Sequence, residues 1–505
     1  MLIEKKDRRI LPRWRDFLTT VSLGELDSRT RQPALLDDAR SSLAEKQADW
    51  DNNHTIWHAV DFIAASFVLG EPQRSSEAAA FVLRSGDAPE PALALARGIA
   101  SNQTDHLLVP DVSPFEGEAL YREIHRLKRR TVSEPRNAVA WVDLSRAYLL
   151  AGNANLARRA MNIACAISPD NRFVLRSATR FLVHQREALE AHRLLVNSPA
   201  TRHDPWLMAA ELGVATTARI GPVFSRPARS LIQSGQHPPM SLTELSSALA
   251  TLELDAGKVP TAKKLFRQSL ECPTENSLAQ AEWASNHVSG LVVKVDEFRV
   301  PRSYEADALQ SHSLGEWDRC FRSALQWLQD QPFSSRPAVL ASYIGSAILQ
   351  DYDTSIRLLS ASLVTNPRHP TLINNLAFAL ANVGELDRAD GYLSLLDAQD
   401  IKDTNGVTLL ATQGLVKFKR GDAHEGRRLY LEAIAKSKKQ GWQRYVAVAS
   451  LYLAREEVLL NTSEKCLALH RAMDEAEKCT DKDVLFLLTR VLELTESSGT
   501  ETTPP

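Results

Sequence analysis

The sequence has little of what disulfide-stabilised, nucleic-acid-binding or sheet-rich proteins need. Its five cysteines are scattered over 505 residues without a C-x-x-C pair, so they predict no disulfide framework. Lys+Arg 60 almost balance Asp+Glu 62, which leaves a net charge of −2. Because phosphate binding needs a basic field, this balance argues against a nucleic-acid partner. Aromatic residues make up only 7%, while Ala, Leu, Arg and Glu are abundant, and this composition favours helices.

The sequence also has no long apolar run. The opening residues 1–9 become charged at once and contain no apolar core, so they do not predict a secretory signal peptide. The most apolar stretch, 59–69, is too short to span a bilayer and contains Asp61. These features predict a cytoplasmic protein in a reducing compartment that makes no membrane contact.

Known catalytic motifs are missing as well. No glycine-rich loop ends in Gly-Lys-Ser/Thr, and the segment 255–258 (Asp-Ala-Gly-Lys) lacks the preceding glycine of a phosphate loop. The sequence contains neither a G-x-S-x-G elbow nor an H-E-x-x-H helix. We therefore expect a protein that is not an enzyme and that holds no cofactor.

What the chain does contain is a period of about 34 residues. Its clearest copy covers about 138–171, where large, small and apolar residues follow one another at fixed intervals: Trp141, Leu144, Tyr148, Ala157, Met161, Ala164 and Pro169. Further copies begin at Pro301, Ser335, Pro370 and Val407. Four starts in nearly regular phase indicate a repeat array, in which amphipathic helix pairs stack to bury faces that a single pair would expose.

The spacing resembles the tetratricopeptide (TPR) repeat, W-x2-L-G-x2-Y, then A-x3-F-x2-A, then P. Ser145 stands in place of the small glycine, and Met161 in place of the aromatic residue. The resemblance covers roughly 137–200 and 241–440. It implies an all-α fold, a right-handed α-solenoid of helix-turn-helix repeats. Because members of this family are mostly scaffolds and peptide-binding adaptors, it also implies a protein that binds other proteins or peptides.

Composition shifts and proline positions divide the chain into seven predicted segments. A proline- and glycine-containing stretch near 226–240 predicts a joint between two blocks of solenoid. The segments are 1–50, an N-terminal cap with a basic arm; 51–136, degenerate helical pairs; 137–225, a TPR-like block; 226–240, the joint; 241–440, the main array; 441–495, C-terminal capping helices; and 496–505, a disordered tail.

Two basic clusters are candidate partner-binding sites. The first is the opening segment, where arginines surround Trp14 and which is a candidate arm that docks on a partner. The second lies just before the first clear repeat. For both clusters the alternative is an ordinary solvated face. The candidate residues are Arg8, Arg9, Arg13 and Trp14 in the arm, and Arg126, Arg129 and Arg130 in the second cluster.

A third candidate comes from the resemblance alone. In peptide-binding TPR proteins, an asparagine on the first helix of a repeat faces the concave groove and bonds the ligand backbone. Asn375 occupies the matching place, and Asn374 lies beside it. The resemblance therefore implies that these two residues take part in partner binding, although a full set of clamp residues is not present.

One group of residues has the spacing of metal ligands. Asp51, His54, His58 and Asp61 lie at offsets that place all four on one face of a continuous helix. Two histidines at i and i+4 with a carboxylate can bind zinc. The alternative interpretation is a polar outer stripe without metal.

These observations leave three hypotheses. The first is a non-catalytic scaffold or adaptor that binds a partner protein or peptide within a larger complex. The second is a regulatory sensor that binds a peptide or small ligand and changes shape at a hinge near 227–239. The third is a metal-binding protein or enzyme that uses residues 51–61. The sequence leaves open whether the solenoid forms a homo-oligomer, for which the end helices in 441–495 are the expected surface.

Overall fold

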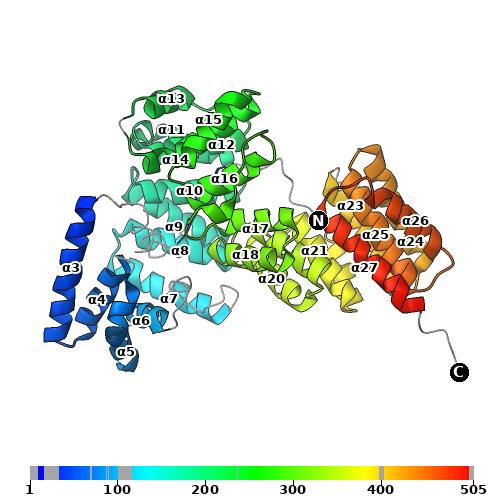
Figure 1. The fold of residues 1–505 in the computed structure, drawn as a ribbon, viewed down its shortest axis with the longest axis horizontal. Coiled ribbons are helices and arrows are strands. Elements are labelled where there is room, and N and C mark those ends of the chain that lie inside the picture. Colours follow the sequence, from blue (N-terminus) through cyan, green and yellow to red (C-terminus); the bar gives the residue numbers. More distant parts are fainter. Residues whose placement is uncertain are drawn as a thin grey trace.

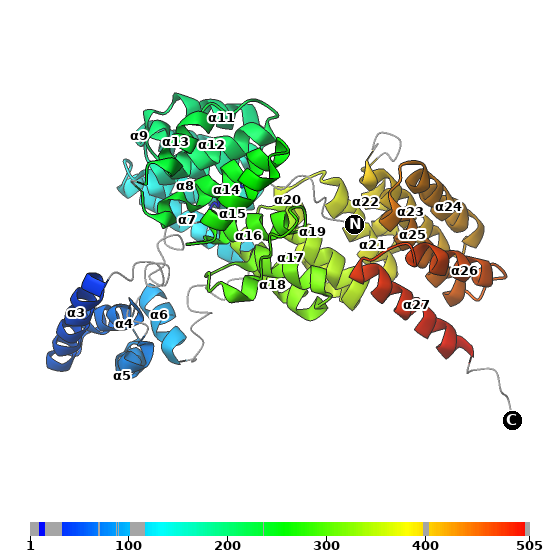
Figure 2. The same cartoon turned by 45° about the horizontal axis from the view of Figure 1, so that its top comes forward.

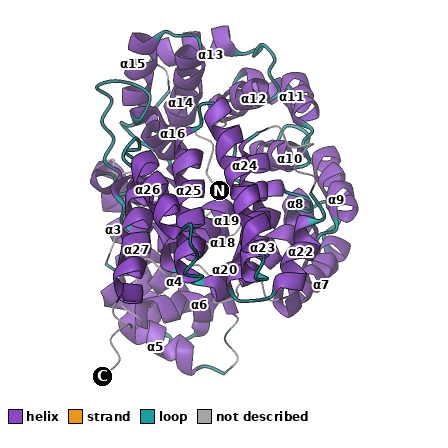
Figure 3. Cartoon of the chain, turned by 90° about the vertical axis from the view of Figure 1, so that its right-hand side faces the viewer, coloured by secondary structure: helices purple, strands orange, loops and turns teal. Residues whose placement is uncertain are grey.

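The structure is a computed structural model, and it consists of helices joined by turns and loops (Figures 1 and 3). The residues it describes are 10–15, 33–68, 71–86, 88, 90–100, 117–235, 237–396 and 403–499. Within these ranges no strand is found, and the predicted all-α solenoid of TPR-type helix pairs is confirmed. None of the described helices is long and apolar enough to cross a membrane.

The first described helices form a small cluster with its own core. Trp50, Phe62 and Ile63 are buried where these helices meet. In Figures 1 and 2 the cluster lies to one side of the remaining helices. Its elements are α3 (Pro33–Asn52), α4 (Ile56–Val68), η2 (Pro72–Ser75), α5 (Ser76–Arg84) and α6 (Glu90–Ala100).

The solenoid follows as a series of antiparallel helices. The elements are α7 (Gly117–Ser133), α8 (Ala138–Leu150), α9 (Ala154–Ile167), α10 (Arg172–His184), α11 (Ala188–Asn197), η4 (Pro199–Arg202), α12 (Pro205–Thr217), α13 (Ser225–Gln233), α14 (Pro239–Asp255), α15 (Val259–Ser269), α16 (Glu275–Ser285), η5 (Val295–Glu297), α17 (Tyr304–Leu314), α18 (Trp317–Asp330), α19 (Ser335–Tyr343), the π-helical turn η6 (Ile344–Leu349), α20 (Tyr352–Thr365), α21 (Pro370–Asn382), α22 (Leu386–Leu393), α23 (Thr404–Lys419), α24 (Ala423–Lys439), α25 (Gln443–Leu459), α26 (Lys465–Ala476) and α27 (Lys482–Gly499).

Local sequence explains where these helices begin and end. Asn137 caps α8 by accepting a hydrogen bond from the Ala140 amide at 3.1 Å. Gly152 then takes a left-handed φ of 77° after α8, a conformation that favours glycine. The predicted repeat starts at Ser335 and Pro370 are the first residues of α19 and α21. The repeat period is therefore visible in the sequence because its turns carry capping and breaking residues.

The segment predicted as a joint, 226–240, contains most of α13 and the start of α14. Around it the core is continuous: Met208 of α12, Ala228 of α13 and Leu245 of α14 belong to one buried cluster. The prolines thus end and start short helices here without interrupting the packing. Whether the segment also bends stays a prediction.

The first turn of the solenoid closes on itself. His184, at the end of α10, bonds the Thr365 carbonyl at the end of α20 through Nε2 at 3.2 Å. Its ring also lies 5.7 Å from that of Phe333, edge to face. A Cβ on Gly152 would lie only 3.1 Å from a side-chain carbon of Val364, so the two ends of the turn are in close contact. Helices α8 to α20 therefore surround a shared interior.

The last helix packs back onto earlier ones. The Tyr343 hydroxyl donates to Asp483 of α27, and Arg490 donates to the Ile348 carbonyl at 2.8 Å. Trp317 and Phe486 pack edge to face at 5.7 Å. Helix α27, red in Figure 2, thus connects the end of the array with α17 to α19.

Candidate functional site

Residues 10–15, which we call the arm, lie inside the first turn of the solenoid. They form no helix or strand, yet Ile10, Trp14 and Arg15 are almost completely buried. The arm contacts helices spread around the turn, from α10 to α18. We call the surface that it covers the first-turn groove.

The apolar start of the arm packs against α12. Ile10 joins the buried cluster of Met208 and Leu212. A Cβ on Gly213 would lie 2.2 Å from the Ile10 carbonyl oxygen, so only glycine allows the arm backbone to approach this closely. On the other side, Asn276 Nδ2 donates to the Leu11 carbonyl at 2.8 Å. The groove therefore holds the backbone of the arm as well as its side chains.

Trp14 is the anchor of the arm. Its indole ring is 0% exposed and lies between two phenylalanines, 5.9 Å from Phe181 and 5.2 Å from Phe333. Within the described residues, the indole Nε1 has no hydrogen-bond partner. The pocket thus recognises the aromatic ring rather than the indole N–H.

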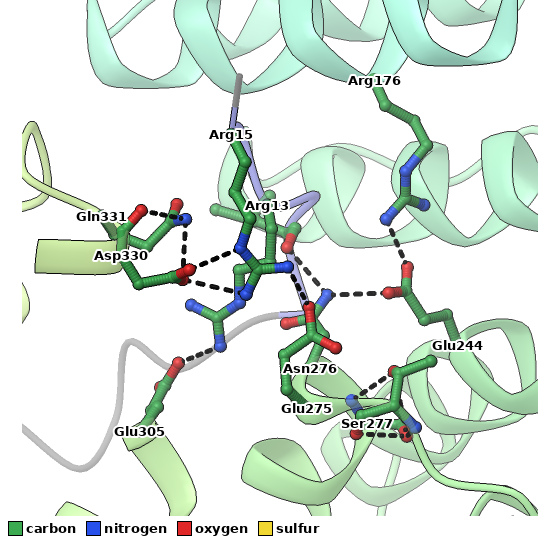
Figure 4. Close-up of polar contacts among 12 residues, drawn as sticks. Arg13, Arg15, Arg176, Glu244, Glu275, Asn276, Ser277, Glu305, Asp330 and Gln331 are labelled. Atoms are coloured by element: carbon green, nitrogen blue, oxygen red, sulfur yellow. Dashed lines mark hydrogen bonds and ion pairs between the residues drawn. The ribbon is translucent and has the colours of Figure 1, made fainter. Parts of the chain in front are cut away.

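Arg15 joins two carboxylates from different helices (Figure 4). Its Nε and Nη2 lie 2.5 and 2.9 Å from the two oxygens of Asp330, and its Nη1 lies 2.8 Å from Glu275. Burial by itself would raise the pKa of both carboxyl groups, but the nearby guanidinium of Arg15 holds both pKa values below their usual range. Both carboxylates are therefore ionised in the docked state.

Arg13 points to the neighbouring helix, where it pairs with Glu305 in the first turn of α17. Glu305 is shared, because Arg336 of α19 lies 2.8 Å from its other oxygen. Close by, burial and the charges of Arg13 and Arg336 lower the pKa of Arg180 to about 10. The centre of the groove is thus a dense set of paired charges, also visible in Figure 4.

The predicted arm residues therefore divide into two groups. Arg13 and Trp14 lie in the first-turn groove of their own chain. Arg8 and Arg9 fall outside the described residues. The docking seen here is intramolecular, and the binding of these residues to a partner protein stays a prediction.

A second concave surface is lined mainly by α21, α23, α24 and α25, and we call it the C-terminal pocket. Its free volume of about 60 Å³ for water-sized groups fits one side chain of a peptide rather than a folded element. Three polar atoms on its wall have no hydrogen-bond partner in the described part of the chain: Asn374 Oδ1, Ser437 Oγ and Tyr452 Oη. Its aromatic wall is formed by Tyr343, Phe378, Tyr430, Tyr445 and Tyr452.

The two candidate asparagines have different surroundings. Asn374 lines the C-terminal pocket. Asn375 is 0% exposed and donates from Nδ2 to the Ser342 hydroxyl of the neighbouring repeat at 2.8 Å. The structure therefore places Asn374 at the concave surface and Asn375 in the contact between repeats.

The basic cluster of α7 faces outward. Ile124 and Leu127 form the buried face of this helix, opposite the arginines. Arg126 pairs with Glu123 at 2.5 Å, and Arg130 with Glu134 at 3.4 Å. Arg129 is exposed, and a role of Arg126, Arg129 and Arg130 in partner binding stays a prediction.

The alternative of a metal stripe at residues 51–61 is not supported, because its residues do not share a helix. Helix α3 ends at Asn52 and α4 begins at Ile56, so His54 lies in the turn between them. There its ring packs 4.2 Å from Trp50, while His58 Nδ1 bonds the Asn53 carbonyl. No group of three or more metal-binding side chains occurs among the described residues. The assumption of one continuous helix was wrong.

Several residues of the first-turn groove were not predicted from the sequence. Gly213 in the middle of α12 could have been noticed in the sequence, because an isolated glycine inside a helix often has a packing reason. Phe333, Glu275 and Asp330 carried no signal, since they lie far from the arm along the chain and come together only when the turn closes.

Comparisons with known proteins concern the overall course of the chain. No family model and no curated protein matches the sequence. Among solved structures, the chain is similar to that of the APC/C hetero-tetramer Cut9–Hcn1, with 12% identity over 91% of this chain and 94% of that chain, at a TM-score of 0.41. Yeast Tom70 shows 13% identity over 89% and 97%, at a TM-score of 0.28. The human IFIT1 dimer with PPP-AAAA shows 12% identity over 94% and 98%, at a TM-score of 0.30.

The helix pairs of the structure and their period in the sequence define this chain as a TPR-like helical-repeat protein in fold. Its function is inferred below from its own surfaces.

Proposed function

We propose that the protein is a non-catalytic scaffold that binds a segment of a partner protein in the C-terminal pocket. The observation that carries this proposal is the combination of an aromatic wall with unpaired polar atoms on one concave surface. A buried polar atom without a partner costs free energy, which a ligand recovers by bonding to it. Aromatic walls with a few convergent polar groups are typical of binding sites.

The shape of the pocket indicates how a partner is held. One apolar or aromatic side chain fills the space beside Phe378 and Tyr452, while the backbone next to it bonds Asn374. Thr408 and Ala411 lie at the half-buried side of the pocket, on α23. Tyr445 and Val448 of α25 are half-buried too, so a partner peptide reaches the pocket between α23 and α25.

The experiment compares two matched variants of the full chain. Ala411→Arg fills the pocket, whereas Ala435→Arg places the same side chain on an exposed position of α24. Partners are captured from the native host with wild-type and variant proteins and quantified by mass spectrometry. We expect at least one stoichiometric partner that Ala411→Arg loses and Ala435→Arg retains. Partners that both variants bind equally would contradict the proposal.

A further inference from the structure

The arm is held like a ligand rather than as a structural element. It adds no helix to the solenoid, and the helices around it pack on their own partners, α10 on α11 and α17 on α18. Its contacts include one anchored ring, ion pairs from two arginines to three carboxylates, and a hydrogen bond to its backbone. These are the contacts by which grooves bind extended peptides.

The charges of the groove define what an occupant must bring. Glu275 and Asp330 are only 13% and 9% exposed, and Arg15 of the arm is the cation that pairs with both. Buried carboxylates that lose their cation are strongly destabilising. Because Asp330 is held by two nitrogens of one guanidinium, arginine suits this position better than lysine. Any replacement for the arm must therefore carry an arginine here.

The neighbouring positions add further requirements. The pocket between Phe181 and Phe333 needs an aromatic side chain directly before that arginine. At the position directly before the aromatic residue, which Arg13 occupies in the arm, Glu305 pairs with a second arginine. Asn276 bonds a backbone carbonyl of the arm, and Gly213 lies closest to the Ile10 carbonyl, so both residues favour an extended chain rather than a particular side chain.

We infer that the first-turn groove is a second binding site, specific for an extended peptide with the pattern Arg–aromatic–Arg, and that the arm is its resident ligand. A partner segment of the same chemistry displaces the arm. The arm is tethered through residues 16–32, so its effective concentration is on the order of millimolar. A free partner segment must therefore compete with the tethered arm, and it displaces the arm only when its affinity is high enough to offset this effective concentration.

The test uses the full chain and a fluorescent synthetic peptide with the sequence of residues 7–17. Trp14→Ala combined with Arg15→Ala weakens the resident arm, and Trp57→Ala combined with Arg193→Ala changes two exposed residues as a matched control. We expect the arm variant to bind the peptide at least 10-fold more tightly than either the wild type or the control. Adding Asp330→Asn to the arm variant should reverse this gain. A peptide with Phe at the position of Trp14 should still bind, and one with Ala should not.

A folded arm variant that does not bind the peptide at millimolar concentration would overturn the inference and make the arm a permanent part of the core. If that variant fails to fold, the same question is tested with the wild-type protein. Excess peptide should displace the arm and expose Trp14 to hydroxyl-radical labelling. Continued protection of Trp14 in excess peptide would overturn the inference. A concentration-dependent dimer in light scattering, lost in the arm variant, would identify the arm of a second copy as the ligand and would overturn the assignment of a partner. Ala411→Arg changes a different pocket, so it should leave peptide binding unchanged and separates this inference from the proposed function.

Discussion

The two concave surfaces of the molecule are built from the same kind of helix pair but differ in chemistry. The first-turn groove is lined by paired charges and is filled by the arm, whose Arg15 lies between Glu275 and Asp330. The C-terminal pocket is lined by aromatic rings, and three of its polar atoms, among them Asn374 Oδ1, have no hydrogen-bond partner among the described residues.

The difference shows that the repeat fixes the position of a surface and leaves its specificity to a few inward residues. In the first turn, closure between α10 and α20 creates a surrounded groove that can bury charges. In the second part, α27 contacts α17 and α25, and the pocket is lined mainly by α21, α23, α24 and α25. If both proposals hold, one chain binds two ligands of different chemistry.

The strongest test of the first surface is removal of its anchor. Trp14→Ala should lower the free energy of unfolding by about 3–5 kcal/mol, because it empties a pocket between two phenylalanines. Trp57→Ala, at a position 66% exposed, should change it by less than about 0.5 kcal/mol. Urea denaturation followed by circular dichroism measures both. Equal effects would show that Trp14 is not buried.

A glycine pair tests whether the arm backbone lies against α12. Gly213→Ala puts a Cβ 2.2 Å from the Ile10 carbonyl oxygen and should cost about 1–3 kcal/mol through overpacking. Gly391→Ala makes the same change in α22 where nothing lies within 4 Å, and should be neutral or stabilising. Thermal unfolding of the two variants gives the comparison. A Gly213→Ala variant as stable as Gly391→Ala would argue against the close approach.

Acid should weaken the closure of the first turn through His184. Burial and the charge of Arg180 lower the pKa of His184 to about 4, from the ordinary value of about 6.5. The unfolded state therefore binds this proton more readily. The stabilisation is complete above pH ~6.5 and decreases by about 1.4 kcal/mol per pH unit toward pH 4.

Denaturation between pH 7.5 and 4.5 measures this slope. His184→Gln should reduce it, while His470→Gln, which changes an exposed residue of α26, should not. His369, whose pKa is also lowered to about 4 by burial and Arg186, will retain a slope of its own. A slope that His184→Gln leaves unchanged would show that His184 is not buried in its neutral form.

The smallest expected effects distinguish the two asparagines. Asn375→Ala removes the donor to the Ser342 hydroxyl in a buried contact and should cost about 1–3 kcal/mol. Asn374→Ala removes an oxygen that has no described partner, so stability should change by less than about 1 kcal/mol while binding of a pocket ligand weakens. Stability and partner capture should therefore respond to different residues.

Much of the fold was predictable because repeats carry local signals. The Trp141–Leu144–Tyr148 spacing and the glycines after helices mark the helix pairs in the sequence itself. The alternative of a metal stripe at residues 51–61 depended on a helix through residues 53–55, where the chain instead turns between α3 and α4. Periodicity identifies faces only where the helix is continuous.

The candidate sites were predictable only in part. The arm stood out because arginines surround Trp14, but its place depended on Phe333 and Asp330, more than 300 residues away. Such contacts depend on how many repeats complete one turn, and no single repeat encodes that number. The same holds for Asn374, whose exposure to the pocket depends on its register against α23 and α25.

The central claim is that Trp14 lies inside the first-turn groove of the intact protein. Hydroxyl-radical labelling of the full chain, read by mass spectrometry, compares Trp14 at 0% exposure with Trp57 at 66% within one sample. We expect Trp57 to be modified readily and Trp14 to be modified only when the chain is unfolded in denaturant. Modification of Trp14 in the native protein at a rate similar to that of Trp57 would contradict the claim.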